Sequence, residues 1–502
     1  MEVLMSRKAF GRLALMILVL IGSISFVSLR SFPIFVDEAV HLWWVHRIIE
    51  FGEWWRPLGV GKPLEAWLVL PMVKLGCDAL TCMRALHVIA GIVTVLLVYL
   101  FVSQFAHHYN AFVSALLTAI SPWIVFYQRL ALADIYLCAA GLFVLYAIYQ
   151  VVRKPNYLAV FLFSVSLVLA ALSKMPVGFL FSFALPLALI FMSSEDRSRL
   201  LRARRRLLLA FVPTLCLISL VAIVAALRIW RGEEPGFGVQ LLFRQSQSTE
   251  RLSLLVSNLI QLVDEFSSPL TPAIALLLLI GMFLSLKQGN WVQRWLASWS
   301  LLSLGSIIII SSWWSSRYFL FVVPPMTISA ISGWQGMLNH LSNRIRTIVM
   351  LGLLVPCVIY LTYQSGLRIF NPPLARWSHM DWRGYIADWP SGYGYPEMAL
   401  YLLSAPKKPS VIYTFEVGTA MQLRAYLTKE AEGMVQQLRL VDGKYITVEE
   451  ARAYLIKQSS AWLVTNSAAD PNDPWVSRHL WRIVGFRKPF STVEVTLYEV
   501  IP

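Results

Sequence analysis

The chain has 502 residues, of which 57% are hydrophobic and 14% are charged, and its mean hydropathy is +0.63. This composition is typical of a polytopic membrane protein and excludes a soluble globular fold. The formal net charge is +15, but the basic residues lie mostly in short connections between apolar runs. In such connections they report membrane topology, so we expect no nucleic-acid partner.

Eleven apolar runs reach the length of a membrane span. They lie at about residues 13–30, 85–106, 110–127, 135–152, 157–173, 176–193, 207–229, 269–286, 295–313, 317–337 and 347–365. The first run is long and lacks a cleavage site, so it predicts a retained span. Arginines and lysines gather in alternate connections, most densely at residues 197–206. The positive-inside rule therefore predicts a cytoplasmic N-terminus. Because the number of spans is odd, the C-terminus is predicted to be extracytoplasmic.

This topology divides the chain into a membrane domain at residues 1–365 and an extracytoplasmic domain at residues 366–502. The first outer loop, residues 31–84, is expected to contain interfacial helices over 38–50 and from Pro63 onward. Strand-like runs at 411–415, 461–465 and 493–498, with a helical pattern at 448–456, predict a small α/β domain at the C-terminus. Cys77 and Cys82 lie in the first outer loop, where an oxidising compartment would allow a disulfide, although two free thiols are favoured.

Acidic residues are scarce at the outer ends of the spans, so each one indicates a function. Asp37 and Glu38 follow the first span, and His41 lies one helical turn after Glu38. Asp134 follows the third span and is predicted at the same membrane face. Two carboxylates there can bind a divalent cation or divide the roles of base and orienting group. The structural alternatives are that Asp37 caps a helix starting at Glu38 and that Asp134 caps the next span.

Several cations are also predicted at this outer face, where the positive-inside rule disfavours them: Lys62, Arg84, Arg129, Lys174 and Arg317. Together they suit a phosphate site, and Lys62 directly precedes a predicted helix N-terminus. Taken singly, each can instead be solvated, snorkelling or paired with a carboxylate. The sequence has no Walker loop, Gly-rich dinucleotide turn or zinc spacing. A lipid-linked phosphate substrate therefore fits better than a cytoplasmic nucleotide.

Six segments, in order, resemble motifs of the membrane glycosyltransferases of the GT-C fold, especially the protein O-mannosyltransferase and aminoarabinose-transferase branch (families 39 and 83). They are Val36-Asp-Glu-Ala, Gly61-Lys-Pro-Leu-Glu-Ala-Trp, Arg84-Ala-Leu-His-Val-Ile-Ala-Gly, Ser121-Pro-Trp-Ile-Val-Phe-Tyr-Gln-Arg-Leu-Ala-Leu-Ala-Asp, Leu172-Ser-Lys-Met-Pro-Val-Gly and Arg317-Tyr-Phe-Leu-Phe-Val-Val-Pro-Pro. The resemblance runs from about residue 13 to residue 337. Val40 and His41 stand where the aminoarabinose branch has an Arg-Tyr pair, and the C-terminal domain matches no family pattern.

The resemblance implies a helical GT-C membrane domain of about eleven transmembrane helices followed by the small α/β domain. It implies an inverting hexosyl- or pentosyltransferase with a polyprenyl-phosphate-linked sugar as donor and a protein, lipid or glycan hydroxyl as acceptor. The reaction would take place at the extracytoplasmic face of a bacterial plasma (inner) membrane. No nucleotide cofactor is expected, and a divalent metal cation is left open.

By the same resemblance, Asp37 is the general base, supported by Glu38. Lys62, aided by Arg129 and Arg317, stabilises the donor phosphate, while Asp134 and His41 orient the site or hold a metal.

The main rival is a lipid-linked-sugar transporter or flippase, which also needs outward cations but predicts a polar path through spans that are almost free of polar residues. An intramembrane aspartyl protease is a further alternative, but its Gly-x-Gly-Asp context is absent.

Overall fold

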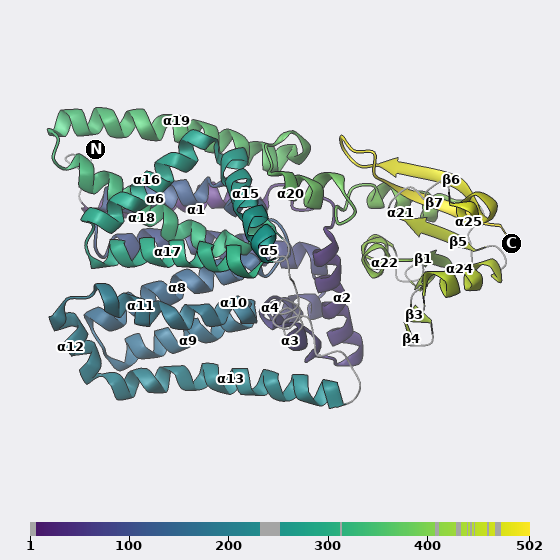
Figure 1. Ribbon diagram of the computed structural model, residues 1–502, viewed down its shortest axis with the longest axis horizontal. Helices are drawn as coiled ribbons and strands as arrows, with labels where there is room; N and C mark the ends of the chain where they lie inside the picture. Colours follow the sequence, from purple (N-terminus) through teal and green to yellow (C-terminus); the bar gives the residue numbers. More distant parts are fainter. Residues whose placement is uncertain are drawn as a thin grey trace. The chain divides into compact units, whose positions relative to one another are not determined.

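The computed structural model describes residues 7–230, 251–311, 314–406, 411–427, 433–438, 440–441, 444–445, 447–458, 461–466 and 473–501. The chain forms two compact units (Figure 1). The membrane unit comprises Met1–Leu29 and Arg47–Ser378, and the C-terminal unit comprises Arg30–His46 and His379–Pro502. The segment that carries Asp37 therefore belongs to the same unit as the C-terminal domain. The predicted domain boundary at residue 365 lies inside a long helix, Asn343–Phe370.

The membrane unit is helical because a helix satisfies its own backbone hydrogen bonds in an apolar environment. Its helices are α1 (Arg7–Ser23), η1 (Ile24–Phe26), α3 (Arg56–Val60), α4 (Pro63–Lys74), α5 (Ala79–Val102), α6 (His108–Ala119), α7 (Pro122–Tyr127), α8 (Asp134–Arg153), α9 (Tyr157–Ser173), α10 (Met175–Gly178), η2 (Phe179–Phe183), α11 (Ala184–Phe191), α12 (Ser194–Arg202), α13 (Arg204–Trp230), α15 (Arg251–Leu270), α16 (Pro272–Gln288), α17 (Trp291–Ile310), η4 (Ser316–Val322), α18 (Val323–Leu338), α19 (Asn343–Phe370) and η5 (Pro372–Leu374). Helix α2 (Val36–Phe51) begins in the C-terminal unit and ends in the membrane unit.

The predicted multi-pass membrane architecture is confirmed, although the spans are less regular than expected. Each predicted span coincides with one or more helical segments. Within the described residues, however, only six helices are long and apolar enough to cross a membrane, or seven if α15 and α16, bent by 111°, form one span. Several of the eleven predicted spans are thus formed by two or more helical segments, such as α6 with α7 and η4 with α18, and not by one continuous helix. Prolines explain several of the breaks, because proline lacks the N–H that continues a helix and favours the first turn of a new one, as at Pro122 and Pro272.

Helix α8 lies at the centre of the membrane unit and is largely buried. It packs against α5 and α9, while α16 packs against α18 (Figure 1). A Cβ added at Gly141 of α8 would lie 2.1 Å from the ring of Phe181, so glycine permits this close contact. In contrast, α13 and α19 expose most of their apolar side chains, as expected of helices that face lipid. Asp134, at the start of α8, is thus attached to the most buried of the candidate spans in the described residues.

The C-terminal unit contains a five-stranded sheet with strand order β2-β1-β5-β7-β6. Strand β1 is parallel to β2 and β5, whereas β7 is antiparallel to β5 and β6. The strands are β1 (Ile412–Thr414), β2 (Val435–Gln437), β5 (Trp462–Thr465), β6 (Leu480–Arg487) and β7 (Glu494–Val500), and a separate pair is formed by β3 (Leu440–Val441) and β4 (Lys444–Tyr445). The helices are α20 (His379–Trp382), the π-helical segment η6 (Arg383–Ala387), α21 (Tyr395–Ser404), α22 (Val417–Arg424), α24 (Val448–Ile456) and α25 (Pro474–His479). The predicted α/β fold, its three strands and the helix at 448–456 are confirmed.

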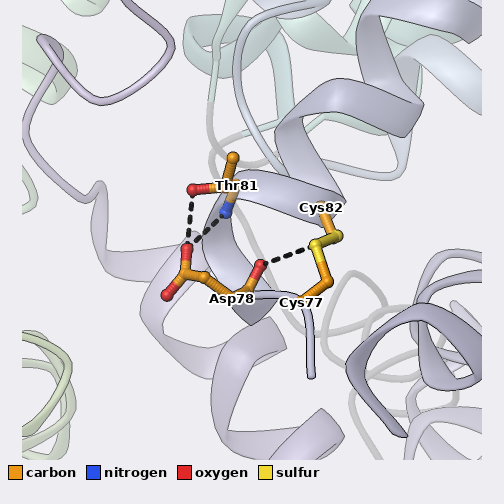
Figure 2. The surroundings of a disulfide bond; sticks show 4 residues. All are labelled: Cys77, Asp78, Thr81 and Cys82. Carbon is orange, nitrogen blue, oxygen red and sulfur yellow. Dashed lines mark hydrogen bonds between the residues drawn. A yellow bond between two sulfur atoms is a disulfide. The ribbon is translucent and has the colours of Figure 1, made fainter. Parts of the chain in front are cut away.

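Cys77 and Cys82 form a disulfide between α4 and α5 (Figure 2). Helix α5 begins after Asp78, whose Oδ2 accepts hydrogen bonds from Thr81 N and Thr81 Oγ1 at 2.9 and 2.7 Å. This N-cap places Cys82 in the first turn of α5, with its Cα 6.4 Å from that of Cys77. The preference for free thiols was wrong because the sequence spacing alone does not reveal this cap.

Candidate active site

The predicted site residues are divided between the two units. Lys62, Arg129, Asp134 and Arg317 belong to the membrane unit, whereas Asp37, Glu38 and His41 belong to the C-terminal unit. Each group has its own geometry.

Asp134 forms a buried ion pair with Lys174. Its Oδ1 accepts a hydrogen bond from Lys174 Nζ at 2.6 Å, and the two side chains are 4% and 14% exposed. Asp134 is the first residue of α8, whereas Lys174 lies at the junction of α9 and α10. The ion pair therefore connects the start of α8 to that junction. The alternative in which Asp134 serves as the helix N-cap is therefore wrong, because Ala133 occupies that position.

The loop that carries Lys62 is bonded to the segment that carries Lys174. Gly61 ends α3 with a φ of 80°, a left-handed conformation that glycine adopts without strain. Its carbonyl accepts the Met175 N–H at 2.8 Å, so residues 61 and 175 hold their neighbours Lys62 and Lys174 in the same region. Helix α4 begins at Pro63, as predicted, with Lys62 as its N-cap. The half-buried Lys62 acts electrostatically on Asp134.

Arg317 completes this group of charges around Asp134. The aromatic ring of Tyr318 lies 4.7 Å from Lys174 Nζ and 5.3 Å from Arg317 Cζ, distances at which a ring stabilises a cation. The preceding residue, Ser316, shares a hydrogen bond of 2.8 Å with the Tyr127 hydroxyl. Three cationic side chains therefore act on a single buried carboxylate, an arrangement that favours binding of an additional anion.

Arg129 is predicted at the same face, but its contacts are of another kind. Its guanidinium donates to four backbone carbonyls at 3.0–3.3 Å, those of Val27, Ser28, Arg368 and Ile369. Burial and, to a smaller degree, Arg84 lower the pKa of Arg129 to about 10, so it stays charged at neutral pH. Arg84 Nη1 likewise donates to the Leu29 carbonyl at 2.6 Å. The contacts of Arg129 join the residues that follow η1 to the end of α19.

The surroundings of Asp134 do not suit a divalent cation. Lys174 Nζ already binds the carboxylate, and Lys62 and Arg317 add further positive charge, whereas a divalent cation needs several anionic or neutral oxygen ligands. In the described part of the chain, no group of three or more His, Cys, Asp and Glu side chains has metal-binding geometry. The residues around Asp134 therefore do not fit a divalent metal site.

A second buried pair, Glu65 and His87, was missed by the sequence analysis. Both side chains are at most 1% exposed, and His87 Nε2 lies 3.3 Å from Glu65 Oε2. His87 Nδ1 lies 2.6 Å from the Met83 carbonyl, and the ring of Tyr136 packs edge-on against the imidazole at 4.5 Å. This pair ties α4, just after Lys62, to α5 and α8. A glutamate within an otherwise apolar helix was the signal that could have revealed it.

In the C-terminal unit, Asp37 and Glu38 lie in the first turn of α2, which begins at Val36. Glu38 is fully buried, and its Oε2 accepts the Phe35 N–H at 3.1 Å. Glu38 thus caps the helix, and the alternative in which Asp37 caps a helix starting at Glu38 is wrong. His41, one turn further along, is 1% exposed and stacks on Trp44 with a centroid distance of 4.6 Å.

Comparison with known proteins decides the fold. Residues 56–229 match the model of the family described as dolichyl-phosphate-mannose-protein mannosyltransferase. ArnT from Cupriavidus metallidurans in the apo state is similar in structure, with a TM-score of 0.63 and 13% identity over 99% of this chain and 98% of that chain. The chain has the GT-C glycosyltransferase fold. The resemblance and fold class predicted from the motifs are therefore confirmed.

Two further solved structures are similar to the chain. ArnT from Cupriavidus metallidurans bound to undecaprenyl phosphate has a TM-score of 0.61 and 12% identity, covering 98% of each chain. The Archaeoglobus fulgidus oligosaccharyltransferase tethered to an acceptor peptide has a TM-score of 0.53 and 13% identity, covering 97% of this chain and 74% of that chain. No curated protein matches the sequence. The family match includes Lys62, Asp134 and Lys174, whereas Asp37 and Arg317 lie outside it.

Replacing Lys174 by Met tests the ion pair at the start of α8. The substitution leaves a buried carboxylate without its hydrogen-bonded cation, which typically costs about 3–5 kcal/mol. We expect a clearly lower melting temperature of the detergent-purified protein. The double variant Asp134→Asn/Lys174→Met removes both charges and should regain most of the lost stability. An unchanged melting temperature in Lys174→Met would contradict the importance of this pair.

Proposed function

We propose that this GT-C protein is an inverting glycosyltransferase that moves a sugar from a polyprenyl-phosphate-linked donor to a hydroxyl of a protein, lipid or glycan acceptor. The observation that carries the proposal is the convergence of Lys62, Lys174 and Arg317 on Asp134 beside the N-terminus of α8. Such a group suits a phosphate that is attached to a lipid. The similar fold of ArnT bound to undecaprenyl phosphate supports this substrate class.

The cations have different roles in this proposal. Lys174 holds Asp134, so Lys62 and Arg317 are the residues that bind the donor phosphate. As the bond between the sugar and the phosphate breaks, negative charge grows on the leaving phosphate, and cations in a partly desolvated site stabilise it. A phosphate leaves readily without a strong general acid. Arg129 supports the site indirectly by fixing the turn before α8 through its four carbonyl contacts.

Asp37 is the proposed general base. It takes the proton of the acceptor hydroxyl while the acceptor oxygen attacks the anomeric carbon and the phosphate departs from the opposite side. One displacement inverts the anomeric configuration and needs no covalent intermediate. Glu38 supports Asp37 by capping the helix that carries both residues, and His41 orients the same helix turn through its stacking on Trp44.

A lipid-linked-sugar transporter would bind the same phosphate, but it would also need a polar route across the membrane. Helix α8, the most buried candidate span, has no charged residue between Asp134 and Arg153. The charged groups described above instead gather near its N-terminal end. This distribution favours chemistry at one membrane face.

We further propose that this face is extracytoplasmic. The arginines of α12 and of the start of α13 favour the cytoplasm, and the Cys77–Cys82 disulfide suits an oxidising compartment. Five of the predicted spans lie between the disulfide, at the N-terminal end of α5, and the arginine-rich segment, and five more lie between that segment and the C-terminal unit. An odd number of spans places its two ends on opposite sides of the membrane. Both therefore agree with a C-terminal unit outside the cytoplasm.

Thiol labelling tests this orientation. In a variant whose Cys138, Cys216 and Cys357 are replaced by Ser, we introduce Ala203→Cys or Gln436→Cys. An impermeant thiol reagent should label these two positions from opposite sides of the membrane, because residue 203 follows the arginine-rich helix α12 and residue 436 lies in β2. Labelling of both positions from the same side would contradict the proposed topology.

Replacing Lys62 by Ala tests the phosphate site. A charge-assisted contact to phosphate is worth roughly 1.5–3 kcal/mol. If it strengthens as the phosphate gains charge, the loss appears in kcat, on the order of tenfold to a hundredfold. A transporter that binds the phosphate equally in all states would lose affinity instead. Lys62→Arg keeps the charge but changes its reach, and should retain partial activity. Wild-type kinetics in Lys62→Ala would exclude Lys62 from the site.

A further inference from the structure

The segment directly ahead of Asp37 is buried against the C-terminal part of its own unit. Phe32, Ile34 and Phe35 are each at most 6% exposed. The ring of Phe32 contacts that of Tyr393 at 5.9 Å, and the ring of Phe35 contacts that of Tyr385 at 4.6 Å. Aromatic residues separated by more than 300 positions in the sequence therefore pack together in this unit.

Hydrogen bonds fix the backbone of this segment as well. Gln422 of α22 is fully buried, and its Nε2 donates to the carbonyls of Ile34 and Pro390 at 3.0 and 3.1 Å. The Val36 N–H donates to the same Pro390 carbonyl at 3.1 Å, and the Ile34 N–H donates to the Tyr426 hydroxyl at 2.6 Å. Both polar groups of the Ile34 backbone are thus bonded to the C-terminal part of the unit.

The fit around these bonds is close. A Cβ added at Gly392 would lie 2.3 Å from the Ile34 carbonyl oxygen, and one added at Gly418 would lie 2.8 Å from Val36 Cγ2. Neither position can accept a larger side chain without moving the segment. The backbone of residues 34–36 therefore has little freedom to shift.

The loop that receives the segment is itself anchored. Lys488, which is 2% exposed, donates from its Nζ to the carbonyls of Asp388, Trp389 and Ser391. These carbonyls flank Pro390, whose own carbonyl accepts from both Gln422 and Val36. The buried side chain of Lys488, which directly follows β6, thus holds the loop of Pro390 in place.

We propose that Gln422 is a positioning residue for Asp37, through which the C-terminal unit sets the place of the catalytic base. Gln422 connects Ile34 with Pro390, and Val36, the first residue of α2, is bonded to that same Pro390. Asp37 follows at once, so a shift of residues 34–36 moves its carboxylate. A misplacement of about 1 Å can lower a rate by a factor of about a hundred. The inference rests on the proposed function, in which Asp37 is the base.

The test replaces Gln422 by Leu in the full-length protein. Leucine keeps much of the volume but cannot donate to either carbonyl. We expect faster hydrogen exchange at the amides of Ile34 and Val36, measured by mass spectrometry, and a kcat about tenfold to a hundredfold lower. The KM for the donor should stay unchanged, because the phosphate-binding residues lie in the other unit. A merely destabilising substitution would instead lower the melting temperature and raise exchange throughout the C-terminal unit, not selectively at Ile34 and Val36.

Gln436→Leu is the matched control, since it makes the same replacement at an exposed position of β2. It should change neither exchange nor kcat. Tyr426→Phe removes only the hydroxyl that accepts the Ile34 N–H, and it should give a smaller loss of kcat in the same direction. It decides the question if Gln422→Leu does not fold.

Two results would count against different claims. Faster exchange at residues 34 and 36 with an unchanged kcat, or unchanged exchange in both variants, would overturn the positioning role and leave the proposed function standing. Absence of sugar transfer by the wild-type protein would overturn the proposed function, and with it the role of Gln422, before any substitution is considered.

Discussion

The ion pair between Asp134 and Lys174 is the interaction on which the membrane unit depends. A carboxylate buried at the start of a central helix is stable only if a cation accompanies it, and Lys174 Nζ binds it at 2.6 Å. That pair joins α8 to the α9–α10 junction, and the bond from Met175 to Gly61 extends the connection to the loop of Lys62. The segment that carries Lys174, the cation paired with Asp134, therefore also holds the loop of a second cation, Lys62. The group of charges around Asp134 therefore carries more positive than negative charge.

The proposed base is controlled separately from the proposed phosphate site. Helix α2 crosses from the C-terminal unit to the membrane unit between His46 and Arg47, so Asp37 is built on one unit and Lys62 on the other. In this proposal, the sheet domain has a function that its sequence does not reveal. It holds the backbone before Asp37, while the helices hold the charges that act on phosphate.

Much of this arrangement was predictable from the sequence, and the failures have physical causes. Apolar runs identified the helices, and the scarcity of charge near the spans drew attention to Asp134, Lys62 and Arg317. The helix breaks at prolines were harder to predict, because hydropathy averaged over a window does not distinguish Pro122 from its neighbours. The contact of Gln422 with Ile34 joins residues 388 positions apart, and no local pattern marks it. Likewise, arginine is a residue type that binds phosphate, and only the fold reveals that Arg129 donates to four backbone carbonyls.

The most direct test of the central claim compares wild-type protein and Asp37→Asn in proteoliposomes that contain a radiolabelled polyprenyl-phosphate sugar and a membrane extract as the acceptor source. The wild-type protein should move the label from the lipid to a hydroxyl acceptor. Asp37→Asn should still bind the lipid phosphate but transfer no sugar, because the amide cannot take the acceptor proton. Substantial transfer by Asp37→Asn, or label that crosses the bilayer while still attached to its lipid, would contradict the assignment of Asp37 as the base of a glycosyltransferase.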